Sequence, residues 1–513
     1  MHTTPKAGID DLAVYLPSLY LPIETLAQAR DLEYAKLNKG LGLEAMSVAD
    51  AHEDVATMAA NAVLQLLQRN NLNPQQIGRI YMGTESAVDG SKPMASYVLD
   101  MLTQYYGGEE GADAFLNCDV VDLTFACIGA VDALQNTLDW VQGGEGRIGI
   151  VVASDIARYE MASGGEYTQG AGAVAMLVKQ NPSLLSIHDS WGVASRSVHD
   201  FFKPLRHFSQ RQVIEEALRQ SGRSEQEIQQ VLNSAAAENG HTDFLGHRDT
   251  YVEVHRDTPV FDGPYSNACY QERIGEALQH YTRQSGLDAR RPVIDDWHRM
   301  VFHLPYAYQA RRMFAELYME ESKKRGDWGR TAALIEQEEP QPALHETEAD
   351  YEKAKAKYLR AVTKTERYRR FVAEKIEKGE RASSKVGNLY TASIFLALMS
   401  TLEAELPTER DLTHSTFGFF AYGSGSKSKV FTATVEEGWR ERTQRFQFMA
   451  ALEQRYELDY PTYERLHRGL QKESVQPPKG AFFLKHIQRE KGVQEGAREY
   501  GWRAMEAVAP LVK

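Results

Sequence analysis

From residue 8 to about residue 186, short apolar runs alternate with longer stretches in which apolar residues recur at helical spacing. That alternation is typical of strands and crossover helices around a buried sheet, so it predicts an α/β fold. The runs that predict strands in this region are 80–83, 115–121, 148–153 and 173–178.

The same pattern returns later in the chain, which indicates two similar halves. An apolar run at 300–304 predicts a strand, and 309–320 and 394–401 predict helices. Two further strands, at 417–422 and 429–435, flank the turn GSGSKS. The predicted divisions are an N-terminal half at 1–186, a C-terminal half at 187–470 and a C-terminal extension at 471–513.

Two stretches interrupt the C-terminal half. Residues 205–256 are rich in Gln, Glu, Arg and Asn and poor in β-branched residues, so we interpret them as a helical insertion at the surface. Residues 321–384 form a mixed-charge run in which Lys and Glu recur at helical spacing through 351–380, with a loop at 336–342. Such runs predict a solvated helical pair.

Charge and cysteine usage narrow the class of protein. The chain of 513 residues has 71 Asp and Glu against 58 Lys and Arg, a net charge of −13. This charge repels phosphate backbones and anionic lipid headgroups, so we expect neither nucleic acid nor membrane as a partner. The thiols Cys118, Cys127 and Cys269 are sparse, odd in number and form no CxxC pair, which favours a reduced, cytoplasmic setting.

No targeting or membrane segment is predicted. The N-terminal residues meet acidic side chains and prolines before any apolar run that would serve as a signal sequence. No segment approaches the roughly 18 to 20 uninterrupted apolar residues that a membrane span needs.

Cys127 lies in DLTFACIGAVDALQ, between an apolar strand and an amphipathic helix. The free N–H groups and the positive dipole end at a helix start favour thiolate over thiol. Ala126, Gly129 and Ala130 leave room for a substrate. A nucleophilic cysteine is therefore one interpretation, and a buried core thiol is the other, because free Cys is among the most buried residue types.

Glu85 and His303 follow other apolar runs. Glu85, in GTESAVDG, is placed to act as a general base, although an ordinary Glu at a helix start has the same pattern. His303, in MVFHLPY, precedes Pro305, which forces an extended turn; a hydrogen-bonded structural histidine is the alternative. With Cys127, they form the Cys, Glu and His set that acyl-transfer chemistry needs.

The glycine-rich segments GGEYTQGAGAVAM and YGSGS match neither GxGxxG nor the GxxxxGK[ST] loop, so nucleotide binding is not predicted. Their glycines suit tight turns or a close approach of backbone to a ligand. No HExxH motif occurs, and His298 and His303 are five residues apart, a spacing that does not stack on one helix face. We therefore predict no metal site.

Taken together, ten ordered segments resemble the hydroxymethylglutaryl-CoA synthase family of the thiolase-like superfamily. The resemblance implies a thiolase-like, five-layered αβαβα fold made of two similar halves, a homodimer, and no metal or redox cofactor. The segments are GIDDLAVYLP, TESAVDG, TFACIGA, SDIARY, GGEYTQGAGAVAM, DFFKP, PVFDG, VFHLPY, GNLYTAS and FAYGSGS.

The resemblance also implies a reaction, the condensation of acetyl-CoA with acetoacetyl-CoA to hydroxymethylglutaryl-CoA in the mevalonate pathway. Cys127 matches the nucleophile that takes the acetyl group, and Glu85 matches the base that removes a proton from its methyl. His303 matches the histidine that positions acetoacetyl-CoA and polarises its ketone. Water then releases the product from Cys127.

Twelve further positions match substrate contacts of the family. Asn388 matches a contact to the acyl chain, and backbone N–H groups near Cys127 and in the YGSGS turn match the donors to the thioester oxygen. Asp and Asn in loops also often make turns, which is the alternative for several of them. The set is Asp155, Tyr159, Thr168, Asp200, Lys203, Ser266, Tyr308, Arg312, Asn388, Tyr390, Gly423 and Ser424.

The chain departs from the family pattern at three places. Ile128 stands where an aromatic residue, often Tyr, usually follows the nucleophile, and Tyr308 stands where a Lys is common. Arg311 and Arg312, within one helical turn, are expected to meet a CoA phosphate in its place. The third departure is the insertion at 205–256.

Two other functions stay open. A β-branching synthase of polyketide assembly uses the same three residues on substrates held by acyl carrier proteins; a basic patch, drawn from Lys203, Arg206, Arg311 and Arg312, would favour it. A catalytically silent scaffold on the same fold is the third hypothesis, to which Ile128 and Tyr308 give some support.

Overall fold

In a computed structural model, the chain is described over residues 6–107, 114–237, 251–254, 258–490 and 492–505. These residues divide into two compact units. The main unit comprises 1–200 and 263–513, and the second unit comprises 201–262. Three bounds of the segments predicted from the sequence, residues 1, 256 and 513, lie outside the described residues.

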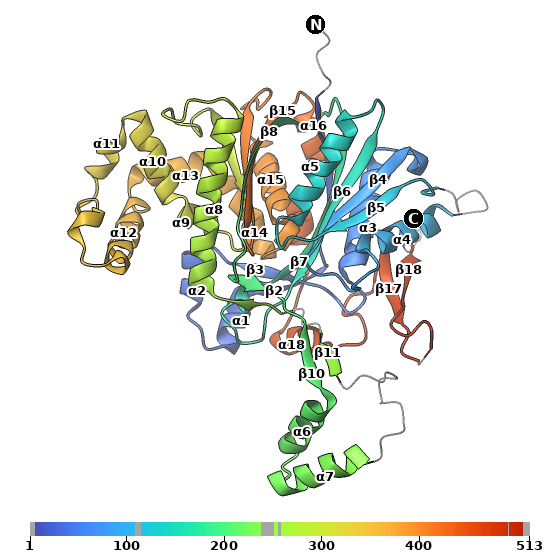
Figure 1. The fold of residues 1–513 in the computed structure, drawn as a ribbon. Helices are drawn as coiled ribbons and strands as arrows, with labels where there is room; N and C mark the ends of the chain where they lie inside the picture. The colour runs from blue at the N-terminus through green and yellow to red at the C-terminus, as the bar shows by residue number, and fades with distance from the viewer. Residues whose placement is uncertain (1–5, 108–113, 238–250, 255–257, 491, 506–513) are drawn as a thin grey trace, which may run out of the picture. The chain divides into compact units, whose positions relative to one another are not determined.

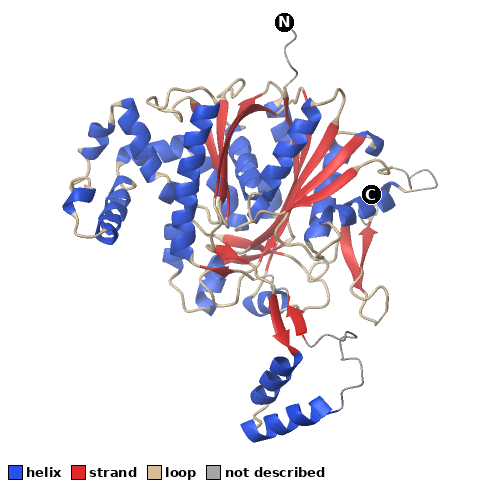
Figure 2. Cartoon of the chain, viewed as in Figure 1, coloured by secondary structure: helices blue, strands red, loops and turns tan. Residues whose placement is uncertain are grey.

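The main unit is built on a nine-stranded mixed sheet (Figure 2), in the order β13-β14-β15-β8-β1-β7-β6-β4-β5. Within the described strands of this sheet, the two sequence halves meet between β1 and β8, through the pairs Gly8 with Ser186 and Ile9 with Leu185. The nine strands are β1 (Ala7–Tyr15), β4 (Ile77–Gly83), β5 (Asp119–Leu123), β6 (Ile148–Ala157), β7 (Gly170–Gln180), β8 (Leu185–Ser195), β13 (Trp297–Phe302), β14 (Thr416–Gly423) and β15 (Lys427–Val435).

Strand β7 shows why both faces of this sheet are covered. Val174 and Met176 point into the core that contains helix α5, whereas Ala173 and Ala175 point into a separate core that contains α3 and α4. Because successive side chains of a strand point to opposite faces, a strand that is apolar at every position needs helices on both sides. These helices are α3 (Val55–Arg69), α4 (Met94–Tyr106) and α5 (Gly129–Gln142).

The C-terminal half repeats this plan. Helix α8 (Gly263–Gln284) packs on β8, β14 and β15, and α15 (Ser393–Glu405) packs on β13 and β14. Helices α5 and α15 contribute to one shared core and lie in the middle of the main unit (Figure 1). The layers are thus α3 and α4, the N-terminal strands, α5 and α15, the C-terminal strands, and α8. The predicted five-layered αβαβα fold is confirmed.

Two predicted elements differ from the structure. The strand predicted at 115–121 begins only at Asp119, because the Phe115 carbonyl accepts the Cys118 N–H at 3.0 Å and turns the chain. Phe115 is buried, so its apolar character reflects core packing in a turn. The helix predicted at 309–320 is interrupted at Phe314, between α9 (Gln309–Met313) and α10 (Ala315–Arg325).

The solvated helical pair predicted for the mixed-charge run is wrong. Three helices cover 351–380, and α14 packs against α15 with most of its residues buried. The carboxylate of Glu380 is buried there beside the Arg311 guanidinium. The charge pattern missed this because the partner of Glu380 is distant in sequence. The helices are α12 (Glu348–Val362), α13 (Glu366–Lys375) and α14 (Glu377–Val386).

The rest of the main unit surrounds this sheet. No helix among the described residues is both long enough and apolar enough to cross a membrane. The remaining elements are β2 (Leu19–Pro22), α1 (Ile23–Ala29), α2 (Tyr34–Leu41), β3 (Ala45–Val48), α11 (Trp328–Ala332), α16 (Trp439–Gln444), α17 (Phe448–Glu453), β16 (Tyr456–Glu457), α18 (Tyr460–His467), β17 (Ala481–Ile487) and β18 (Arg498–Arg503).

The second unit contains the predicted insertion. Two short strand pairs hold it: β9 (Phe201–Phe202) pairs antiparallel with β12 (Val260–Phe261), and β10 (Arg206–Ser209) with β11 (Tyr251–Val254). Ser209 and Gln212 form a capping box at the start of the first of two helices, which satisfies its free N–H groups. These helices are α6 (Gln210–Gln220) and α7 (Glu225–Ala237).

Candidate active site

Three parallel strands, β4, β5 and β6, end at one edge of the sheet, where α/β folds gather ligand sites. Glu85 follows β4 and Cys127 follows β5. The Cys127 Sγ lies 3.1 Å from Glu85 Oε1 and donates a hydrogen bond to it. The thiol is 8% exposed. The structure therefore brings the predicted nucleophile and the predicted base into direct contact.

Glycine permits this contact. A Cβ atom on Gly83, the last residue of β4, would lie 2.1 Å from the backbone nitrogen of Ala130 in α5. Only glycine lets the strand end approach the helix start so closely. Cys127 itself precedes α5, whose N-cap is Ile128, and Ala126 has a left-handed φ of 40°. Non-glycine residues rarely adopt this conformation, and such strain clusters at functional sites.

Asp155, at the end of β6, is completely buried. Its Oδ1 accepts hydrogen bonds from the backbone N–H of Glu85 at 2.9 Å and from the hydroxyls of Thr84 and Ser86. Its Oδ2 accepts from the N–H and the hydroxyl of Thr391. Burial raises the pKa of Asp155, against these donors. Since protein groups occupy both oxygens, this placement favours a positioning role for Asp155 over a substrate contact.

Tyr159 and Tyr390 lie beside the pair. Their ring centroids are 6.4 Å apart. Burial raises the pKa of both phenols, and electrostatic interaction with the acidic groups of Glu85 and Cys127 raises it further, so both hydroxyls stay protonated at neutral pH. Tyr390 has a left-handed φ of 43°, and its N–H donates to Asn388 Oδ1 at 2.8 Å.

The segment that contains Thr168 is joined by a hydrogen bond to the loop that contains Asn388 and Tyr390. The Thr168 carbonyl accepts the Asn388 N–H at 2.9 Å, and the Thr168 hydroxyl donates to the Gly165 carbonyl at 2.8 Å. Four of the predicted substrate residues, namely Tyr159, Thr168, Asn388 and Tyr390, thus belong to two loops that are joined by hydrogen bonds.

His303 follows β13, which runs parallel to β14. Its N–H donates to the Phe420 carbonyl, and its carbonyl accepts from the Tyr270 hydroxyl, both at 3.0 Å. The ring is 2% exposed, and Nδ1 has no hydrogen-bond partner within the described part of the chain. Burial lowers the pKa of His303 to about 3, so the imidazole is neutral at physiological pH. Nδ1 of His303 is therefore available to form a hydrogen bond with a ligand.

The end of β14 contacts the segment that contains Cys127. A Cβ atom on Gly423 would lie 2.7 Å from the Phe125 carbonyl oxygen and 2.8 Å from Ile128 Cγ2. The end of β14 and the nucleophile loop therefore meet backbone to backbone. Ile128, where the family usually has an aromatic residue, is fully buried against this strand end.

Asp200 holds the turn that follows β14. Its carboxylate accepts from the Gly425 N–H at 2.7 Å, the Tyr422 hydroxyl at 2.8 Å and the Ser266 hydroxyl at 3.3 Å. Asp200 is completely buried. The predicted residues Asp200 and Ser266 thus bond to each other, and together they fix the turn that contains Ser424.

The residues that were predicted to contact the CoA part of the substrate have different surroundings. Arg311 stacks on the Tyr308 ring, with its Cζ 4.1 Å from the ring centroid, and forms ion pairs with Glu377 and Glu380. Two carboxylates of the same chain thus hold Arg311, and its contact with a CoA phosphate stays a prediction. Arg312 is exposed, and Lys203 belongs to the second unit.

Sequence reasoning missed the residues that hold the site together. Thr391 and Ser86 lie inside segments quoted for the resemblance, next to predicted residues, yet nothing in the sequence links them to Asp155. Across the described ranges, no group of three or more His, Cys, Asp and Glu side chains is placed to hold a metal ion.

Comparison with known proteins gives a consistent result. The family model described as hydroxymethylglutaryl-coenzyme A synthase N terminal matches residues 4–183, and the corresponding C-terminal model matches 249–467. A hydroxymethylglutaryl-CoA synthase of Haloferax volcanii is 30% identical over 465 residues, which cover 90% of this chain and 91% of the relative.

Solved structures agree. The structure of MvaS in complex with 3-hydroxy-3-methylglutaryl coenzyme A has a TM-score of 0.72 and 28% identity, and covers 98% of this chain and 100% of that one. The HMG synthase of the curacin biosynthetic pathway has a TM-score of 0.67 and 21% identity, with 97% and 100% coverage. The second likeness concerns the fold alone.

Proposed function

Because this chain belongs to the hydroxymethylglutaryl-coenzyme A synthase family, we propose that it condenses acetyl-CoA with acetoacetyl-CoA to 3-hydroxy-3-methylglutaryl-CoA. The chain is an acyl-transferring enzyme. The observation that carries the proposal is the 3.1 Å contact between Cys127 Sγ and Glu85 Oε1, in a loop that Asp155 holds in place.

In the first step, the Cys127 sulfur attacks the carbonyl carbon of acetyl-CoA. The bond from that carbon to Cys127 forms, and its bond to the CoA sulfur breaks. Glu85 takes the thiol proton and passes it to the departing CoA thiolate, so the carboxylate is restored. The product is an acetyl group on Cys127, with its methyl beside Glu85.

In the second step, Glu85 removes a proton from that methyl, which the thioester acidifies. The carbanion attacks the ketone carbon of acetoacetyl-CoA, and a carbon–carbon bond forms. His303 is neutral, so it acts by donating an N–H hydrogen bond to the developing alkoxide, without a full positive charge. The alkoxide then takes the proton that Glu85 holds.

In the third step, water attacks the thioester carbon on Cys127. The carbon–oxygen bond forms and the carbon–sulfur bond breaks; one proton of the water goes to the sulfur, so Cys127 returns as a thiol, and the other is released to solvent. The released product carries a new carboxylate. We assign this product to the mevalonate pathway, and a cytoplasmic location and a homodimer remain predictions of the family resemblance.

The carrier-protein function is the alternative, since the reactive end of the substrate is the same. It requires a basic patch for an acidic carrier protein. Of the four residues named for that patch, Arg311 is held by Glu377 and Glu380. The relative with 30% identity is a hydroxymethylglutaryl-CoA synthase, whereas the curacin-pathway structure shares the fold at 21% identity. Free CoA substrates are therefore the better-supported choice.

The test is the mass of the intact protein after mixing with acetyl-CoA, followed by a chase with acetoacetyl-CoA. We expect a gain of one acetyl group at Cys127 and its discharge as hydroxymethylglutaryl-CoA. Acetylation without discharge would overturn the free-CoA proposal in favour of carrier-bound substrates. Absence of acetylation would make the silent scaffold the leading hypothesis.

A further inference from the structure

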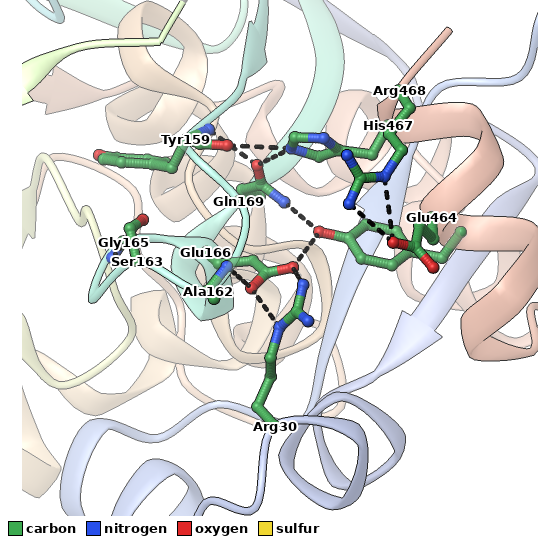
Figure 3. Close-up of polar contacts among 11 residues, drawn as sticks. Arg30, Tyr159, Ala162, Ser163, Gly165, Glu166, Gln169, Glu464, His467 and Arg468 are labelled. Carbon is green, nitrogen blue, oxygen red and sulfur yellow. Dashed lines mark hydrogen bonds and ion pairs between the residues drawn. The ribbon is translucent and has the colours of Figure 1, made fainter. Parts of the chain in front are cut away.

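The loop that joins β6 to β7, residues 158–169, contains Tyr159 and Thr168 and is held by side chains outside the catalytic set (Figure 3). The Tyr159 N–H donates to Gln169 Oε1 at 2.8 Å, and its carbonyl lies 2.9 Å from His467 Nε2. A Cβ atom on Gly165 would lie 2.1 Å from Tyr159 Cδ1, so the loop backbone packs directly on the Tyr159 ring.

The hydrogen bonds of this loop form a chain in which each group accepts from the one before it and donates to the next, from the Tyr159 N–H to the Glu166 carboxylate. Gln169 uses its oxygen to accept from Tyr159 N–H, so its Nε2 donates to the Tyr463 hydroxyl at 2.7 Å. The Tyr463 hydroxyl must then donate onward, to Glu166 Oε1 at 3.0 Å. His467 Nε2 carries a proton, because both of its partners, the Tyr159 carbonyl and Gln169 Oε1, are acceptors.

Glu166 is the acceptor at the end of this chain of bonds. Its side chain is 2% exposed, and it accepts two hydrogen bonds from Arg30, both at 2.8 Å, and one from the Ala162 N–H at 2.6 Å. Burial alone would raise the pKa of Glu166, but these donors and the Arg30 charge lower it. A buried carboxylate with this donor set stays ionised and fixes the direction of every bond before it.

We propose that Glu166, Tyr463 and Gln169 are positioning residues, which place Tyr159 beside Cys127 and Glu85 for the condensation step. The inference rests on the proposed function. Arg30, the C-cap residue of α1, and Tyr463 of α18 belong to helices that pack together in a small core separate from the two large ones. They anchor the loop to a part of the fold outside the large sheet.

The proposal separates the two chemical steps. Cys127 and Glu85 are held by β4, β5, α5 and Asp155, none of which belongs to the loop at 158–169. We therefore expect the extent of Cys127 acetylation to be unchanged when the network is broken. The condensation step needs Tyr159 in place, and misplacement of a group at the reacting centre costs about 100-fold in rate.

The variant Tyr463→Phe removes the central hydroxyl and keeps the ring. Tyr460→Phe is the matched control, because Tyr460 lies on the same helix and only its ring contacts Arg30, 5.1 Å from Cζ. We expect kcat of condensation to fall roughly 10- to 100-fold in Tyr463→Phe and less than about 2-fold in Tyr460→Phe. The extent of Cys127 acetylation should equal that of the wild type in both.

A double-variant cycle separates positioning from general stability. Glu166→Gln places an amide nitrogen against the donors of Arg30 and Ala162, so it breaks the same network from its other end. Combined with Tyr463→Phe, it should lower kcat no further than the worse single variant does, because both act through one chain of bonds. Unfolding midpoints in urea are measured on the same samples.

The outcomes are distinct. An active wild type with equal kcat for Tyr463→Phe and Tyr460→Phe would overturn the inference and leave the proposed function standing. Loss of acetylation together with condensation, in step with a lowered unfolding midpoint, would show a merely structural role. A wild type that never acetylates would overturn the proposed function itself.

Discussion

Asp155 and Glu85 are 70 residues apart in sequence, yet the Asp155 carboxylate accepts the Glu85 backbone N–H at 2.9 Å. The same carboxylate accepts both donors of Thr391, in the loop that contains Tyr390. One buried side chain therefore sets the position of the predicted base and of the loop that contains Tyr390.

Replacing Asp155 by Asn should disrupt both loops. The amide nitrogen of Asn cannot accept, so one set of donors, either at Glu85 or at Thr391, is left facing another donor. We expect kcat to fall roughly 10- to 100-fold in steady-state assays. Asp189→Asn is the control, since Asp189 is exposed, and equal rates for the two variants would contradict the positioning role.

Cys127→Ala should abolish acyl-enzyme formation, because it removes the only atom proposed to hold the acetyl group. Cys118→Ala is the control and should acetylate like the wild type. Burial and then the neighbouring Asp119 raise the pKa of Cys118 to about 12, so that thiol stays protonated and is a poor nucleophile. The measurement is the intact-protein mass of each variant after mixing with acetyl-CoA. An acetyl adduct on the Cys127→Ala protein would refute the mechanism.

Glu85→Ala should permit acetylation of Cys127 but not the condensation that follows. The thiol can lose its proton to water, so Cys127 is still acetylated, more slowly. Condensation lacks its base and should fall by about 10²- to 10⁴-fold. The acetyl mass should therefore persist during a chase with acetoacetyl-CoA, and prompt discharge as hydroxymethylglutaryl-CoA would assign the base elsewhere.

Acid should destabilise the protein partly through His303. Its pKa is about 3 in the folded chain and near 6.5 when unfolded, so the unfolded state binds the extra proton first. The contribution of His303 to the free energy of unfolding is therefore fully present above pH 6.5, and it is lost as the pH falls from 6.5 toward 3.

Between pH 7.5 and 5, this loss amounts to about 2 kcal/mol of the free energy of unfolding. In His303→Gln, urea titrations should show a pH dependence weaker by that amount. Burial also lowers the pKa of His52, His188 and His298, so a residual dependence of the same sign should remain. An identical dependence in the variant would show that His303 is not buried neutral.

The predicted homodimer is open to a direct measurement. Strand β5 is an edge strand with exposed Val121, and an unpaired edge offers free N–H and C=O groups to a second copy. We expect sedimentation velocity to show a dimer, and Val121→Lys to shift it to the monomer. Leu344→Lys, at an exposed apolar residue away from the sheet, should leave it unchanged.

The parts of the site that follow local pattern were predictable. Cys127, Glu85 and His303 each follow an apolar run, and such runs end where buried strands end. The bonds from Asp155 to Thr391 and from Glu166 to Tyr463 span 236 and 297 residues, and no local pattern records which distant donors a buried carboxylate will meet. The burial of Glu380 beside Arg311 was missed for the same reason.

The pairing of β9 with β12 has a consequence for the length of chain that this position can hold. Phe201 pairs with Phe261 and Phe202 with Val260, so the two ends of the second unit lie side by side at its base. Because lengthening a loop between neighbouring ends costs little further entropy, this position can accommodate a segment as long as 203–259. Asp200 and Ser266 lie outside that segment in the sequence, so their hydrogen bond and the bond from Asp200 to the Gly425 N–H in the turn of Ser424 do not need it.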